Sequence, residues 1–204
     1  MNRAMIMIFL LSLAMFLTAC GGNEAEQDTQ NQNTDDSTQS ESANEEAQET
    51  NATAEEEVLV SLKNPEGQVV GTATLTEEES GVGIKLEGED LPPGSHGFHI
   101  HEVGKCDPPD FESAGAHYNP TDAKHGFDDP EGPHAGDMKN IEVAEDGTVT
   151  ADVLNEMVTL KEGTDNTLYT EEGTALMIHS DADDYKTQPS GNAGERIACG
   201  VIGE

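Results

Sequence analysis

Apolar and polar side chains alternate along a series of short runs that begins at residue 57. The first run, EVLVSLK, places Val58, Val60 and Leu62 on one side of an extended chain, because successive side chains of a strand point to opposite faces. The segment NPEG follows at residues 64–67 and has turn composition. This period of two predicts a β-strand with one face against a core.

Further runs of the same kind continue to the C-terminus, separated by segments rich in Gly, Pro, Asn and Asp that are typical of turns. They lie at residues 68–76, 82–88, 97–102, 140–154, 174–180 and 196–203. The dipeptide Asp146-Gly147 divides one of these runs and predicts a hairpin. Because no run beyond residue 56 has a helical period, we expect eight strands in an all-β sandwich or barrel.

Two connections between these strands are much longer than turns. They run from about Val103 to Lys139 and from about Ser180 to Glu195. In a compact domain, structureless loops beyond roughly 12 to 15 residues are usually functional or disordered. Both segments are rich in His, Asp, Gly and Pro, which favours a functional role.

The first 19 residues, MNRAMIMIFLLSLAMFLTA, have the pattern of an export signal, with Arg3 before an apolar run and small residues before Cys20. An uncleaved membrane anchor is the alternative. The run from Ala4 to Ala19 is about 16 residues long, however, and roughly 20 are needed to span a bilayer. The motif Leu-Thr-Ala-Cys resembles a bacterial lipobox, which implies lipidation of Cys20 and an extracytoplasmic, membrane-anchored protein.

Residues 20–56 are polar and acidic. From residue 21 onward this segment holds eleven Asp and Glu, no Lys or Arg, and no apolar side chain larger than Ala. It cannot bury enough apolar surface to offset the entropy of ordering the chain. We therefore expect a disordered tether ahead of one folded domain, residues 57–204.

The charge of the chain excludes some partners. The whole chain carries -33 at pH 7, and the expected domain keeps 31 acidic and 8 basic residues, a net charge of -23. A domain this acidic has no electrostatic basis for binding nucleic acid or anionic lipid headgroups. With Cys20 lipidated, Cys106 and Cys199 remain, and in an exported protein two such cysteines most simply form one disulfide.

Two histidines lie one residue apart in the segment GFHIHE. On a strand His99 and His101 point to the same face, close enough to reach one ion, while Phe98 and Ile100 point to the other. This motif alone is weak evidence, because buried or surface histidines without a metal are the more common case. By strand parity His96 faces away from the pair, and we interpret it as an ordinary polar residue.

Other residues with metal-binding side chains strengthen the case for a metal site. The further candidates are His117, His125, His134, Asp137 and His179. Imidazole suits zinc and copper, and histidines with a carboxylate form a common closed set of four donors for zinc. Seven candidates are too many for one ion, and they are one short of two separate four-ligand sites unless a ligand is shared.

Six segments together resemble the copper,zinc superoxide dismutase family over essentially all of residues 57–204. They are GFHIHE, SAGAHYNP, KHG, GPHAGDMKN, LMIHSDADD and GNAGERIACGVIG. The resemblance implies an eight-stranded Greek-key β-sandwich or flattened barrel with two long functional loops. In that family one deprotonated histidine bridges both metals, which resolves the count of seven.

The resemblance also implies roles for individual residues. The implied copper ligands are His99, His101, His117 and His179, and the implied zinc ligands are His117, His125, His134 and Asp137. The other implied roles are a hydrogen bond from His99 and His125 to Asp183, a disulfide between Cys106 and Cys199, and an arginine beside copper, Arg196.

The implied activity is the conversion of superoxide to dioxygen and hydrogen peroxide by copper redox cycling, with a structural zinc. Arg196 would dock the anion and His117 would carry a proton to it, and Lys186 is a second candidate cation that guides the substrate. Because superoxide is an anion and the domain carries -23, we expect a slower enzyme than the diffusion-limited members of the family.

Two other interpretations stay open from the sequence. A lipid-anchored copper- and zinc-binding protein without useful turnover could dispense with His179 and Arg196, yet both are present. A structural domain used for wall contacts leaves the ordered set of candidate ligands unexplained. The sequence makes no prediction of the oligomeric state.

Overall fold

The computed structural model describes residues 57–203. The predicted signal segment, the lipidated Cys20 and the tether lie outside the described residues and stay predictions. Within residues 57–203, no helix combines the length and the apolar character that crossing a membrane requires.

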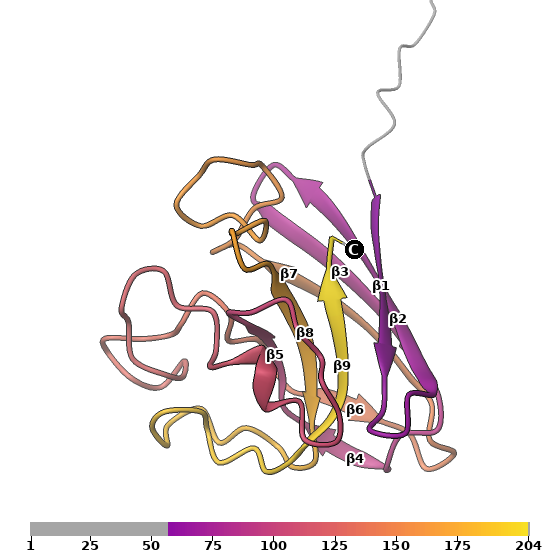
Figure 1. Ribbon diagram of the computed structural model, residues 1–204. Coiled ribbons are helices and arrows are strands. Elements are labelled where there is room, and N and C mark those ends of the chain that lie inside the picture. The colour runs from indigo at the N-terminus through magenta and orange to yellow at the C-terminus, as the bar shows by residue number, and fades with distance from the viewer. Residues whose placement is uncertain (1–56, 204) are drawn as a thin grey trace, which may run out of the picture. The chain divides into compact units, whose positions relative to one another are not determined.

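Nine strands and one short 3-10 helix make up the regular structure of residues 57–203 (Figure 1). The strands are β1 (Glu57–Lys63), β2 (Val69–Glu78), β3 (Gly81–Gly88), β4 (Gly94–His96), β5 (Phe98–His101), β6 (Ile141–Val143), β7 (Val149–Asn155), β8 (Thr174–His179) and β9 (Arg196–Ile202), and the helix is η1 (Glu112–Ala114). The expected all-β architecture is confirmed.

Seven of these strands form one antiparallel sheet in the order β5-β8-β9-β1-β2-β3-β7. The last strand, β9, therefore lies beside the first, β1, which is the non-sequential order of a Greek key. Figure 1 shows this sheet curling, with β1 to β3 on one side and β5 and β8 on the other. The strands β4 and β6 form a separate two-stranded sheet.

The alternation in the sequence explains which side chains the sheet buries. Val60 and Leu62 of β1 are fully buried, whereas Leu59, the residue before Val60, is 67% exposed. By contrast β5 and β8 are buried along their whole length. A strand with both faces buried needs a cover on its outer face, and the long loops provide that cover over β5 and β8.

Two details differ from the sequence-based expectations. A ninth strand is present, because the three residues of β4 pair with β6. The prediction of a hairpin at Asp146-Gly147 is wrong. The turn itself forms, and the Ala144 N–H donates to Thr148 O at 2.8 Å. The two flanking strands do not pair with each other, however, because β6 pairs with β4 and β7 pairs with β3. The turn residues determined a local reversal, and the burial of whole sheet faces decided the strand partners.

The two long connections lie where the sequence placed them, at residues 102–140 between β5 and β6 and at residues 180–195 between β8 and β9. The described residues also contain a third long connection, residues 156–173, which the sequence did not predict. Thr159 bridges to Thr167 within it, and the Glu77 carboxylate accepts the Leu160 N–H at 2.7 Å. Figure 1 shows it at the end of the sheet opposite to residues 180–195.

Candidate metal centre

The first loop pairs with β5, which is the edge strand of the large sheet. The Ile100 N–H donates to Gly136 O at 2.9 Å, and Ile100 O accepts the Tyr118 N–H at 2.8 Å. Isolated bridges join His101 to His117 and His99 to Asp137. The loop thus satisfies backbone groups that an edge strand leaves unpaired. Side chains separated by up to 38 positions in the sequence, those of His99 and Asp137, meet on one face of β5.

Close packing of the loop on β5 depends on a glycine. A Cβ atom added at Gly136 would lie 2.2 Å from Ile100 O, which is far inside van der Waals contact. No other residue allows the backbone to approach β5 this closely. The position of Asp137, the next residue, follows from that approach.

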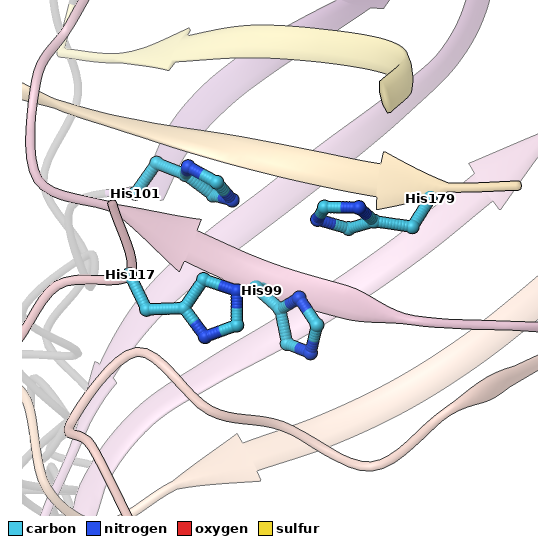
Figure 2. A group of neighbouring side chains, drawn as sticks. All are labelled: His99, His101, His117 and His179. Atoms are coloured by element: carbon cyan, nitrogen blue, oxygen red, sulfur yellow. The ribbon is translucent and has the colours of Figure 1, made fainter. Parts of the chain in front are cut away.

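Four histidines converge on one point between β5, β8 and the first loop (Figure 2). Strand parity places His99 and His101 on the outer face of β5, while Phe98 and Ile100 enter the core. The candidate ligand atoms of His99, His101, His117 and His179 all lie within 4.8 Å of one another. Each of these side chains is buried.

The nitrogen atoms that face this point have no hydrogen-bond partner. They include Nδ1 of His99 and the Nε2 atoms of His101, His117 and His179. A buried polar atom without a partner is costly, so groups of this kind call for a missing ligand. The opposite nitrogens of two rings are satisfied: His99 Nε2 donates to Asp183 at 2.8 Å and His101 Nδ1 donates to Gly115 O at 3.0 Å. The residues therefore fit a copper ion bound by four imidazoles.

A second group lies against the first and consists of His117, His125, His134 and Asp137. One oxygen, Asp137 Oδ1, is 2.7, 3.1 and 3.3 Å from the Nδ1 atoms of His117, His125 and His134. The other oxygen accepts the backbone N–H groups of Gly126 and His134, which fixes the carboxylate. Three imidazoles and a carboxylate are a closed set for zinc, and the residues fit that ion.

His117 belongs to both groups. Its Nδ1 atom faces Asp137 in the zinc group, and its Nε2 atom is buried without a partner in the copper group. The rings of His117 and His99 are 4.0 Å apart between centroids. Seven ligands can form two four-ligand sites only if one ligand is shared, and His117 is that shared ligand.

In the metal-free groups, the pKa values of most candidate ligands favour the protonation state that binds a cation. Burial, reinforced by His99, lowers the pKa of His117 to about 4 and that of His179 to about 3, although Asp137 partly offsets the effect at His117. Burial opposes ionisation of Asp137, but hydrogen bonds from His117 and His125 and the nearby His134 ring outweigh it and hold its pKa well below the usual range. At neutral pH His117 and His179 are thus neutral and Asp137 is ionised, as metal ligation requires.

His125 behaves differently. Burial lowers its pKa, but hydrogen bonds to Asp137 and Asp183 outweigh burial and raise the pKa to about 9. A metal ion must therefore displace a proton from this ring, which makes metal uptake by the zinc group dependent on pH.

We expect the metal-free chain to be most stable near pH 6.5. Below this value His117 and His179 take up protons only when the chain unfolds, because their folded pKa values are about 4 and 3, so stability falls toward pH 3. The contribution of His125 is fully present below pH 6.5 and is lost as pH rises through about 9. Melting temperatures of the chelator-treated full chain between pH 4 and 9.5 measure this, and a flat profile would contradict it.

Asp183 lies behind both groups and joins them. Its two oxygens accept the Nε2–H of His99 at 2.8 Å and the Nε2–H of His125 at 3.1 Å. The backbone of Asp183 is held in turn by Asn140, whose side chain donates to Asp183 O at 2.9 Å and accepts the Asp183 N–H at 2.9 Å. This carboxylate orients one ring of each metal group.

Replacing Asp183 by Ala should weaken both metal groups together. An outer partner of this kind typically contributes about 10- to 100-fold to metal affinity, and we expect a loss of that size for copper and for zinc. Competition with chelators of known affinity measures it. Asp152→Ala, which removes an exposed carboxylate from β7, is the matched control and should leave both affinities unchanged.

Arg196 begins β9 and lies beside the copper group. Its Nη1 donates to Phe111 O at 2.6 Å and its Nη2 donates to Gly115 O at 2.7 Å. The same Gly115 carbonyl accepts the Nδ1–H of His101, so one oxygen links the arginine to a copper-group histidine. Burial lowers the pKa of Arg196, and nearby Glu112 and Asp110 oppose that shift.

A disulfide fastens the first loop to the sheet. Cys106 in the loop is bonded to Cys199 in β9, and 93 positions separate them in the sequence. The loop that carries the two carbonyl acceptors of Arg196 is therefore anchored at Cys106. Lys186 lies farther out: its side chain is 69% exposed and its Nζ pairs with Asp128 at 3.2 Å.

His96 is not the ordinary polar residue that parity suggested. It is buried, and its ring nitrogens lie 2.8 Å from His179 O and 2.7 Å from Pro92 O. The ring thus holds the backbone of a copper-group histidine. No feature of the sequence indicated this, because the contact is made to backbone oxygens.

Comparisons with known proteins agree with this geometry. Residues 69–202 match the family model described as copper/zinc superoxide dismutase. "Superoxide dismutase [Cu-Zn] 1" of Aquifex aeolicus (strain VF5) is 58% identical over 142 residues, which are 69% of this chain and 84% of that protein.

Solved structures give the same result. The structure of a SOD-like protein from Bacillus subtilis superposes with a TM-score of 0.69 at 45% identity, covering 71% of this chain and 97% of that one. Cu/Zn superoxide dismutase from Brucella abortus superposes with a TM-score of 0.60 at 33% identity, covering 72% of this chain and 99% of that one. With its two adjoining ligand groups, the chain belongs to the copper/zinc superoxide dismutase family.

Proposed function

We propose that this chain converts superoxide to dioxygen and hydrogen peroxide outside the cytoplasm, with copper bound by His99, His101, His117 and His179 and zinc bound by His117, His125, His134 and Asp137. The observation that supports this most directly is the sharing of His117 between two buried groups of ligand atoms. The presence of Arg196 beside the copper group adds a binding group for an anion.

The chemistry divides between the metals and the protein. Copper, when bound, supplies one-electron oxidation of one superoxide and one-electron reduction of a second. Arg196 binds and orients the anion, since its guanidinium is charged and held by two carbonyls. His117 would hold a proton at Nε2, the buried atom that faces the copper group, only while that atom is not bound to copper, and would donate it to the reduced substrate; solvent would supply the second proton of hydrogen peroxide.

Metal analysis and a superoxide assay on the purified full chain test the proposal. We expect about one copper and one zinc per chain, and consumption of superoxide that requires copper. A protein that binds both metals and leaves superoxide unconsumed would be a metal-binding protein without turnover.

Measuring the rate against ionic strength tests the expected slow approach of the anion: a rate that fell steeply with added salt would contradict it.

Arg196→Ala should lower kcat/KM for superoxide by about tenfold without loss of either metal, because it removes the cation that orients the substrate. Arg196→Lys should fall between this variant and the unchanged chain, since it keeps the charge and loses the planar fork. Lys85→Ala, which removes an exposed cation from β3, is the control. An unchanged kcat/KM in Arg196→Ala would argue against the docking role.

Lys186 is proposed as a second cation that guides the substrate. Its pair with Asp128 reduces the charge that it presents, so we expect Lys186→Gln to change kcat/KM less than Arg196→Ala does. Kinetics of the two variants at equal ionic strength compare them, and a larger effect of Lys186→Gln would reverse the assignment.

We also propose a lipid anchor at Cys20, on the basis of the apolar leader, the Leu-Thr-Ala-Cys motif and the acidic segment that follows. Expression in a bacterium with labelled fatty acid tests this. The unchanged chain should carry label and remain with the membrane fraction, and Cys20→Ser should lose the label. Absence of label from the unchanged chain would refute the anchor.

A further inference from the structure

Phe111, in the first loop, has a backbone conformation that is rare for its residue type. Its φ is 55° and its ψ is 23°, which is the left-handed region. That region is disfavoured for any residue with a bulky side chain, and glycine or asparagine is the usual occupant. A conformation of this kind persists only where surrounding contacts impose it, and it is most often found at functional sites.

The side chain of Phe111 is enclosed by contacts. The ring is only 2% exposed and lies in a small apolar cluster separate from the main core. The other buried members are Ala114, Ala175, Met177 and Cys199, with Cys106 packed against them. The cluster therefore includes the disulfide and the outer face of β8, on which the first loop lies.

The backbone of Phe111 holds the arginine beside the copper group. Phe111 O accepts the Nη1–H of Arg196 at 2.6 Å, and the second acceptor, Gly115 O, lies four residues farther along the same loop. The orientation of the first carbonyl depends on the left-handed backbone at Phe111. The backbone at this residue therefore sets one of the two bonds that aim the guanidinium.

We propose that Phe111 is a positioning residue for anion binding: burial of its ring keeps its backbone left-handed, and its carbonyl thereby aims Arg196 at the copper group. Without the ring, the residue would return to the ordinary region of φ and ψ and its carbonyl would turn away from Arg196. This proposal rests on the proposed function only for the identity of the anion.

Azide affinity of the copper- and zinc-loaded full chain tests it, because azide is a small anion that binds copper(II) and its binding is measured by absorbance. We expect Phe111→Ala to weaken azide binding about tenfold, the effect of losing a hydrogen bond to a charged group. Phe111→Leu keeps an apolar anchor and should bind azide nearly as the unchanged chain does. Phe111→Ser, which also lacks the anchor, should behave as Phe111→Ala does and serves if that variant fails to fold. Phe111→Asn, which tolerates the left-handed region, should keep more of the azide affinity than Phe111→Ala does.

A double-mutant cycle with Arg196→Ala tests whether Phe111 affects azide binding through Arg196. If Phe111 acts through Arg196, Phe111→Ala causes no further loss of azide affinity in the Arg196→Ala chain. Leu168→Ala, a large-to-small change at a fully buried site, is the control and should lower stability without changing azide affinity. Unchanged azide affinity in Phe111→Ala, or an equal loss with and without Arg196, would overturn the proposal.

These outcomes are separate from the proposed activity. A chain that binds copper and azide but does not consume superoxide would refute the dismutase function, and the azide cycle would still decide the role of Phe111.

Discussion

His179→Ala should remove copper binding and lower superoxide dismutation by more than about 100-fold, since loss of a direct ligand costs more than the 10- to 100-fold typical of an outer partner. His179 contributes one of the four converging nitrogens of the copper group and has no part in the zinc group. Zinc content should therefore stay near one per chain. Elemental analysis and a superoxide assay measure both results on the same sample.

His134→Ala is the reciprocal variant. His134 belongs to the zinc group alone, so this change should remove zinc and leave copper bound. Equal dismutation by His179→Ala and the unchanged chain would refute the assignment of copper to this group. Loss of both metals from both variants would show that the two groups do not bind their ions separately.

Replacing Cys106 and Cys199 by Ser should lower the free energy of unfolding by about 4 to 5 kcal/mol, because the bond closes a loop of nearly a hundred residues in the unfolded chain. This is a large part of the roughly 5 to 15 kcal/mol that stabilises a typical domain. Urea unfolding of the metal-free chain at neutral pH measures the difference, since metal binding would otherwise add to the stability.

Reduction of the unchanged chain is the matched control for the serine variant. Treatment with a thiol reductant should reproduce most of the loss, and the reductant should have no effect on the serine variant. A serine variant as stable as the oxidised chain would show that the disulfide does not stabilise the fold. A serine variant clearly less stable than the reduced chain would show that Cys106 and Cys199 also contribute through packing in the small cluster with Phe111.

The sequence predicted the inner and outer faces of the strands well. A period of two places Val60 and Leu62 inward and His99 and His101 together on one face, and the structure confirms both placements. Strand parity is a local property of an extended chain, so it needs no knowledge of neighbouring strands. The same reasoning failed at Asp146-Gly147, where a hairpin was expected, because strand pairing depends on the whole sheet.

Only the tertiary structure revealed contacts that cannot be predicted from residue types. His96 lies near the backbone oxygen of His179, and Phe111 holds Arg196 through its own carbonyl. Both contacts involve main-chain atoms, which every residue possesses, so no motif marks them. The left-handed backbone at Phe111 was equally hidden, because a phenylalanine in a loop rarely adopts it.

By itself, then, the sequence determined the β-strand class, the acidic charge, the seven candidate ligands and, through a resemblance, their division between copper and zinc. Only the tertiary structure decided that the first loop pairs with the edge strand β5, so that Asp137 and His117 come to lie beside His99 and His101. The physical reason is that ligand identity is carried by side-chain chemistry, whereas the separation of two ligands depends on backbone hydrogen bonds between segments far apart in the chain.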